Sequence, residues 1–140
     1  MVIWLVWSVD ICIQGWKKMT IDDLLANTKG KTVAFDLDCT LTIPRHEMGI
    51  DFMNLTPNEF CKILYAAEPN KKAIATLNDF AVNNHIMIYT ARSSYAKNIT
   101  YQWLEENDVE FDEVIFRKAT YDLFFDDKAY NADILNGEKE

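Results

Sequence analysis

Residues 32–42 read Thr-Val-Ala-Phe-Asp-Leu-Asp-Cys-Thr-Leu-Thr. The stretch opens with a short apolar run that follows Lys-Gly-Lys, and this pattern predicts a buried strand over residues 32–36. A second apolar run, His-Ile-Met-Ile-Tyr-Thr, occupies residues 85–90 and also ends in a polar side chain. A segment with helical periodicity separates the two runs. Strands that alternate with helices predict an α/β fold with a parallel sheet.

The other expected elements complete this alternation. We expect short helices at 20–26 and 57–65, a helix that starts at Pro69 and ends at Asn83-Asn84 in a left-handed conformation, a helix capped by Ser93 and ending near Asn107, and strands at 113–116 and 122–125. The rest of residues 41–67 is expected to be a loop or flap. The order of the elements indicates a Rossmann-like three-layer sandwich, with a mostly parallel central sheet covered on both faces.

Length, charge and cysteine content exclude several classes of protein. The chain has 140 residues, which predicts one domain, residues 19–140, preceded by an apolar extension, residues 1–18. A net charge of −8 argues against nucleic-acid or anionic-membrane binding, although a bound cation would still allow an anionic substrate. The three cysteines lack the spacing of a metal site or a disulfide framework, which favours a reducing, cytoplasmic location.

The extension of residues 1–18 is strongly apolar but is interrupted by Asp10. It is too short for a transmembrane span, and it lacks the basic region and cleavage site of a signal peptide. Three interpretations stay open: a further strand or docking segment, a weak membrane anchor, or upstream codons before a functional start at Met19.

Polar side chains follow each of the predicted strands. They are Asp36 and Asp38, Thr90, Lys118, and Asp126 and Asp127. Ligands of such sheets bind at the carboxyl ends of the strands, so we expect these side chains to lie together. Crowded carboxylates are costly unless a cation neutralises them, and oxygen ligands without His or Cys suit Mg²⁺. A single aspartate would be interpreted as a turn residue or a helix cap, but the whole set predicts a magnesium site.

Four segments resemble the motifs of the haloacid-dehalogenase-like superfamily. Phe35–Thr42 resembles the first motif, Asp-x-Asp-x-Thr after a hydrophobic strand, and Tyr89–Arg92 resembles the second. Lys118 resembles the third motif and Phe125–Ala129 the fourth, so the ordered set covers most of the chain. The resemblance implies a Rossmann-like fold without a large cap domain, and Mg²⁺-dependent phosphatase chemistry.

The resemblance and the chemistry together suggest a role for each residue. Asp36 would attack phosphorus to form an aspartyl-phosphate, and Asp38 would protonate the leaving group and then activate water. Thr90 would donate a hydrogen bond to the phosphoryl group, while Lys118 would offset negative charge. The resemblance implies that the carboxylates of Asp36 and Asp126 and the main-chain carbonyl of Asp38 hold Mg²⁺, while Asp127 binds it through water or orients Lys118. The chain departs from the family pattern at Cys39, where glycine is usual, and at Ala119, where proline often follows the lysine.

The substrate is predicted from a looser similarity. Residues 65–69, 88–92 and 121–129 resemble small phosphatases associated with capsule or surface-polysaccharide biosynthesis, which favours a sugar phosphate. Arg45, His46 and Arg92 are candidates for contacting the leaving group, or else are solvated loop residues and a surface ion pair. A nucleotidase, a polynucleotide end phosphatase and a catalytically silent binding module stay open as alternatives. Capless members of the superfamily act on large substrates or close their sites by oligomerising, so a homo-oligomer also stays open.

Overall fold

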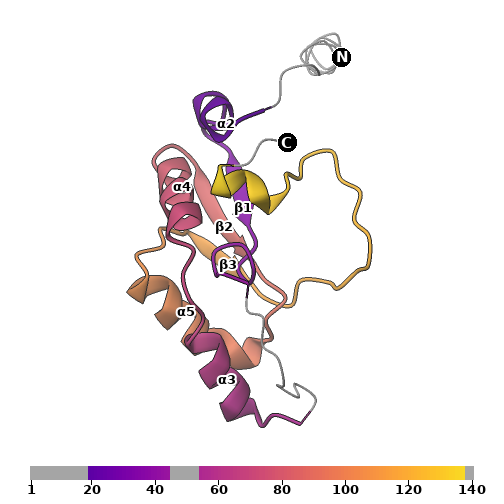
Figure 1. The fold of residues 1–140 in the computed structure, drawn as a ribbon. Coiled ribbons are helices and arrows are strands. Elements are labelled where there is room, and N and C mark those ends of the chain that lie inside the picture. The colour runs from indigo at the N-terminus through magenta and orange to yellow at the C-terminus, as the bar shows by residue number, and fades with distance from the viewer. Residues whose placement is uncertain (1–18, 45–53, 138–140) are drawn as a thin grey trace.

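The structure, a computed structural model, describes residues 19–44 and 54–137, and Figure 1 shows how its elements are arranged. One parallel sheet holds three strands in the order β1-β2-β3, with β1 at Thr32–Phe35, β2 at His85–Tyr89 and β3 at Glu113–Ile115. Thr32 pairs with His85, and Met87 pairs with Glu113. The predicted α/β class with a Rossmann-like parallel sheet is therefore confirmed.

Helices connect the strands and extend beyond the sheet. The helices of the described residues are α2 (Ile21–Asn27), α3 (Pro57–Tyr65), α4 (Lys71–Ala81) and α5 (Lys97–Glu106), with short 3-10 helices η1 (Ser94–Ala96) and η2 (Ala132–Asn136). α4 connects β1 to β2, and α5 connects β2 to β3. Right-handed crossovers that advance in one direction place both helices on the same face, and both lie to the left of the sheet in Figure 1.

Local sequence signals account for the position of α3. Thr56 accepts a hydrogen bond from the main-chain N–H of Glu59, and the Glu59 carboxylate accepts from the Thr56 N–H in return. Pro57, at the first helical position, has no N–H that would need a partner. The predicted helix over residues 57–65 is confirmed.

The core lies between the sheet and α4. It contains Phe35 of β1, Ile86 and Ile88 of β2, and residues of α4, among them Leu77, which is fully buried. The rings of Phe35 and Phe80 meet edge to face, with their centroids 6.0 Å apart. α5 adds the buried residues of its inward face, and η2 packs against α4.

The two faces of the sheet are covered unevenly. Along β1 and β2 the buried residues alternate with more exposed ones, as expected for a sheet with one covered face. Phe35 and Ile88 pair in register on the buried face, whereas Ala34 and Tyr89 are exposed. The described residues therefore cover one face well and leave the other largely open, unlike the sandwich covered on both faces that the sequence predicted.

Three predicted helix boundaries are wrong. Pro69 forms an isolated bridge with Thr42, and α4 begins only at Lys71, because the Asn70 side chain accepts the main-chain N–H of Ala73 as a cap. At the other end α4 stops at Ala81, and neither Asn83 nor Asn84 is left-handed; instead Asn84 Nδ2 donates to the main-chain oxygens of Thr28 and Phe80. Ser93 makes no side-chain cap and precedes η1 rather than α5.

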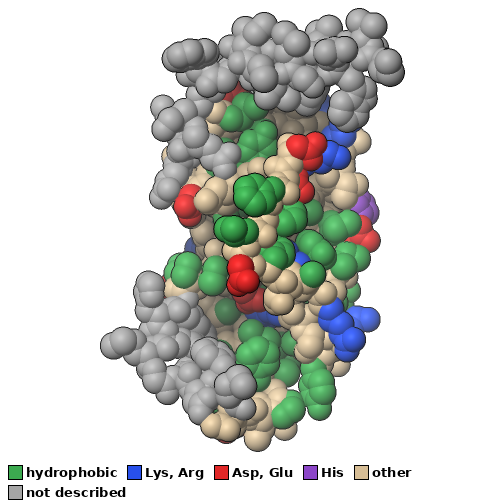
Figure 2. Space-filling view, turned by 90° about the vertical axis from the view of Figure 1, so that its right-hand side faces the viewer, with side chains coloured by type: hydrophobic (Ala, Val, Ile, Leu, Met, Phe, Trp, Pro, Cys, Tyr) green, Lys and Arg blue, Asp and Glu red, His purple; other side chains and the backbone are tan. Residues whose placement is uncertain are grey.

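The predicted strand at 122–125 is also wrong. Every residue from 119 to 131 is exposed, and in Figure 1 this segment forms a wide arc away from the sheet before η2. Figure 2, which views the molecule from that side, shows exposed hydrophobic side chains with charged ones among them. A short apolar run becomes a strand only where it finds an edge to pair with and a surface to cover. In this arrangement residues 122–125 pair with no strand of the sheet and stay exposed.

Some sequence predictions concern residues that the structure does not describe. The extension of residues 1–18 is one of these, so its three interpretations stay predictions. Within residues 19–44 and 54–137, no helix has the length and apolar character needed to cross a membrane.

Replacing Leu77 by alanine should lower the free energy of unfolding by about 3 kcal/mol, because the side chain is fully buried and its removal leaves a cavity. Denaturant unfolding would measure the loss. Val82→Ala is the matched control, since Val82 ends the same helix with 75% of its surface exposed. Equal losses for both variants would contradict the described core.

Candidate functional site

The candidate site is built around the tight turn that follows β1. The carbonyl oxygen of Leu37 accepts the main-chain N–H groups of Thr40, Leu41 and Thr42 at 3.2, 2.9 and 3.1 Å. Leu37 and Leu41 are fully buried, so they anchor the turn in the core while the residues between them face outward. Cys39, in the turn, has a φ of 63°, and its N–H donates to Thr42 Oγ1 at 2.9 Å.

Asp36 lies at the end of β1, next to a cation. Its Oδ1 accepts the main-chain N–H of Leu37 at 2.9 Å and lies 3.9 Å from Lys118 Nζ. Partial burial raises the pKa of Asp36 above its ordinary value of 3.8, and the nearby Lys118 and the Leu37 N–H act against this rise. The carboxylate keeps 41% of its side-chain surface exposed, so an incoming electrophile can reach it.

Lys118 is held in place from several directions. Its main-chain N–H donates to the carbonyl of Thr90 at 2.9 Å, which joins the segments after β2 and β3. Its ammonium lies 5.4 Å from the ring centre of Tyr89 and 6.0 Å from that of Tyr121. These cation–π contacts and the Asp36 carboxylate together keep the charge at the carboxyl edge of the sheet.

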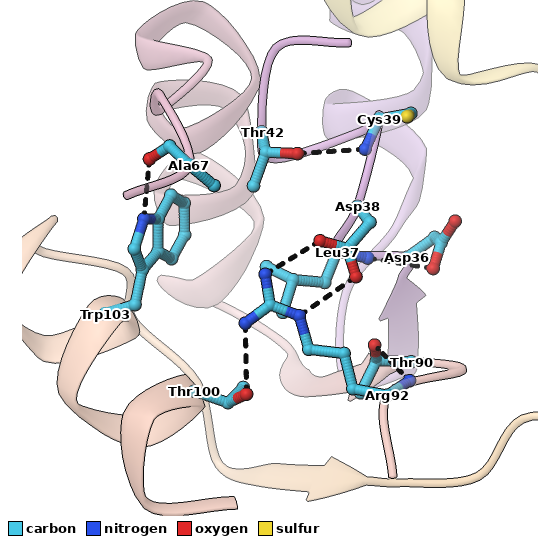
Figure 3. A network of polar contacts seen from close by, with 10 residues as sticks. All are labelled: Asp36, Leu37, Asp38, Cys39, Thr42, Ala67, Thr90, Arg92, Thr100 and Trp103. Carbon is cyan, nitrogen blue, oxygen red and sulfur yellow. Dashed lines mark hydrogen bonds and ion pairs between the residues drawn. The ribbon is translucent and has the colours of Figure 1, made fainter. Parts of the chain in front are cut away.

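Asp38 is paired with Arg92, as Figure 3 shows. Arg92 Nε and Nη2 donate to the two carboxylate oxygens at 2.9 and 2.7 Å, and Nη1 donates to Thr100 Oγ1 at 3.1 Å. The Arg92 side chain is 2% exposed and that of Asp38 is 43% exposed. A pair of parallel bonds to a buried guanidinium fixes both the position and the plane of the carboxylate.

The structure changes the expected roles of Arg92 and Thr90. Arg92 is neither a surface ion pair nor, as placed, a contact for a leaving group, because three of its donor groups already bind Asp38 and Thr100. Thr90 is fully buried, and its hydroxyl accepts the main-chain N–H of Arg92 at 3.2 Å. In this arrangement the hydroxyl supports the turn after β2.

The two carboxylates of the site are balanced by two cations. Asp36 faces Lys118, and Asp38 faces Arg92. In this structure the side chains of Lys118 and Arg92 therefore supply the positive charge that neutralises the two carboxylates.

The residues implied for Mg²⁺ do not converge in this structure. Asp126 and Asp127 lie on the exposed segment 119–131, where Asp126 Oδ1 accepts the main-chain N–H of Lys128. Within the described residues, no three His, Cys, Asp or Glu side chains come together to hold a metal ion. As placed, these residues do not fit the ion.

Two of the predicted site residues lie outside the described part of the chain, and two residues that contact the site were not predicted. Arg45 and His46 lie outside the described residues. Thr100 was missed, although a polar residue one turn before Trp103 and Leu104 on the inward face of α5 was a signal that it had a buried partner. Tyr89, whose ring lies beside Lys118, was interpreted as a strand residue that opens the second motif and not as a contact of Lys118.

Comparison with known proteins shows the fold and no more. A solved structure of a structural-genomics target from Vibrio cholerae is 21% identical to this chain, with a TM-score of 0.56, and the match covers 77% of this chain and 89% of that one. No protein-family model matches the chain, and no curated protein matches it.

Replacing Cys39 by glycine should raise the free energy of unfolding by roughly 0.5 kcal/mol. Only glycine adopts a positive φ without steric cost, so the change removes strain from the folded state. This gain exceeds the loss of stability caused by the greater entropy that glycine gives the unfolded chain. Cys61→Gly is the control: Cys61 lies in α3 with an ordinary φ, so there the same change should lower stability. Losses at both positions in thermal unfolding would show that the turn is not strained.

Proposed function

We propose that this protein is a phosphomonoester hydrolase of the haloacid-dehalogenase-like type, with Asp36 as the nucleophile and a sugar phosphate as the substrate. The observation that carries the proposal is the geometry of Asp36: a partly exposed carboxylate at the end of β1, 3.9 Å from the ammonium of Lys118. The superfamily resemblance of residues 35–42, 89–92 and 118 supports the same assignment.

The chemistry divides into two displacements at phosphorus. In the first, a carboxylate oxygen of Asp36 attacks the phosphorus, and the bond to the leaving oxygen breaks with its electron pair on that oxygen, which takes a proton from the Asp38 carboxyl group. Lys118, beside the attacking oxygen, stabilises the negative charge of the phosphoryl group as it transfers. In the second displacement, water attacks the aspartyl-phosphate, and the carboxylate of Asp38 takes the proton of that water while Asp36 is released.

Magnesium is implied by the superfamily resemblance, but no step above passes through it. The present arrangement supplies Asp36 and Asp38 without a third ligand, because Asp126 and Asp127 are on the arc of residues 119–131. A requirement for Mg²⁺ would mean that this arc takes up another arrangement, with Asp126 beside Asp36, during turnover.

A hollow between two helical segments is our candidate for holding the rest of the substrate. Its volume is about 290 Å³, and it lies between α3 and η1, beginning at Ser93, the neighbour of Arg92 in the chain. Its lining is uncharged and includes Phe60 and Tyr95. Such a lining suits the neutral ring of a sugar better than a second charged group.

A cytoplasmic location belongs to the same proposal. Within the described residues Cys39 and Cys61 are free thiols. Free thiols in a small α/β domain are typical of a reducing compartment.

Asp36→Asn should lower phosphate release by more than about a thousandfold, because an amide cannot act as the nucleophile. The measurement is release of inorganic phosphate from sugar phosphates, nucleotides and p-nitrophenyl phosphate, with Mg²⁺ or with EDTA. Asp79→Asn, at an exposed aspartate of α4, should retain full activity. The panel ranks sugars against nucleotides, and loss of activity in EDTA would show that a divalent cation is required.

Absence of release from every substrate would overturn the proposed function, provided that the protein is folded. The alternative then favoured is the silent binding module on the same fold. Equal activity of wild type and Asp36→Asn would show instead that a different residue is the nucleophile.

Lys118→Met should shift the acid limb of the pH profile of kcat/KM to higher pH. Asp36 attacks only as the carboxylate, and Lys118 is the charge that lowers its pKa, so removing the ammonium raises that pKa further above 3.8. Activity would then be lost earlier as the pH falls. The exposed Lys62 of α3 gives the control variant Lys62→Met, whose acid limb should not move.

A further inference from the structure

Arg92 stands out in the described part of the chain because a charged side chain is buried at the rim of an open site. Its guanidinium is 2% exposed, although the residue lies only a few positions after the end of β2. Burial of an arginine is costly unless its charge and its donors are satisfied. The contacts of Arg92 therefore indicate the role of this residue.

The first contact is with Asp38. Nε and Nη2 form two parallel bonds, 2.9 and 2.7 Å long, one to each oxygen of the carboxylate. A single ammonium could not hold the carboxylate plane in this way, whereas the planar fork of arginine does. Without these bonds the half-exposed Asp38 side chain could rotate among the usual staggered conformers.

The remaining contacts tie Arg92 to the rigid part of the fold. Nη1 donates to Thr100 Oγ1 on α5, and the Thr100 side chain is fully buried. The main-chain N–H of Arg92 donates to Thr90 Oγ1, and its carbonyl accepts the N–H of Arg117 at 3.0 Å. The orientation of Asp38 is therefore set by α5 and by the segments after β2 and β3, and not by its own turn alone.

We propose that Arg92 is a positioning residue for Asp38, anchored by Thr100, and that it acts in the hydrolysis of the aspartyl-phosphate; this inference rests on the proposed function. In that step the Asp38 carboxylate must point at the attacking water in order to take its proton. A displacement of about 1 Å in such a group can cost about a hundredfold in rate. Arg92 itself touches neither the water nor the phosphorus.

The test is Arg92→Lys, which keeps the positive charge but loses the fork. We expect kcat to fall about a hundredfold with p-nitrophenyl phosphate as the substrate, and KM to fall with it, so that kcat/KM changes little. Because the first displacement is spared with this leaving group, phosphorylated enzyme should accumulate and be recovered by acid quench. Arg117→Lys is the matched control, since the exposed side chain of Arg117 donates to Ser94 Oγ and not to Asp38. It should show neither effect.

Two further variants separate positioning from a general structural role. Thr100→Val removes the anchor of Arg92 and should cause a smaller change in the same direction, and it keeps the proposal testable if Arg92→Lys fails to fold. In an Asp38→Asn background, Arg92→Lys should have no further effect on kcat, because the group that it positions is already gone. A merely structural role would lower kcat by the same factor in both backgrounds.

The outcomes are distinct. A folded Arg92→Lys, or a folded Thr100→Val, with wild-type kcat and no accumulated phosphoenzyme overturns the inference and leaves the proposed function intact. Additive effects of Arg92→Lys and Asp38→Asn also overturn it. A wild-type enzyme that releases no phosphate and forms no phosphoenzyme dependent on Asp36 overturns the proposed function, and the inference with it.

Discussion

A buried guanidinium needs a counter-charge and a partner for its donors, and the carboxyl edge of this sheet is arranged around that need. Arg92 meets it with Asp38 from the turn after β1 and with Thr100 from α5. These contacts join segments that are far apart in sequence, and they do so where the parallel strands end. The pairing of β1 with β2 brings the segments near one another, and the ion pair then sets their separation to within a hydrogen bond.

Charge compensation at this edge comes from within the chain. Asp36 and Asp38 are each matched by a cation, so the local cluster is close to neutral although the chain carries a net charge of −8. For the proposed phosphate substrate, this near neutrality means less repulsion at the cluster than the net charge of the chain alone implies. The two pairs also differ in kind. Lys118 stands 3.9 Å from Asp36, a separation that leaves the carboxylate accessible, whereas Arg92 binds Asp38 tightly on both oxygens.

The sequence predicted the elements whose signals are local. Thr56, Pro57 and Glu59 define the start of α3 without help from the rest of the chain. The rule that ligands bind at the carboxyl ends of parallel strands correctly predicted that Asp36 lies near Lys118, because both residues follow strands of one sheet. No local sequence pattern could have indicated this contact, since 82 residues separate the two. The predictions that failed concern segments whose structure depends on contacts with distant parts of the chain. The apolar run at 122–125 paired with no strand, Pro69 paired with Thr42 so that α4 began only at Lys71, and Arg92 turned inward because Thr100 and Asp38 were both within reach.

The exposed thiol of Cys39 directly follows Asp38 in the turn. Burial raises its pKa above the ordinary value of 9.0, and the charges of Asp38 and Asp36 raise it further. Peroxides and alkylating reagents react with the thiolate and hardly with the protonated thiol. The two carboxylates therefore lower the fraction of thiolate at this position. Cys39 should accordingly react more slowly with such reagents than an exposed cysteine with an ordinary pKa.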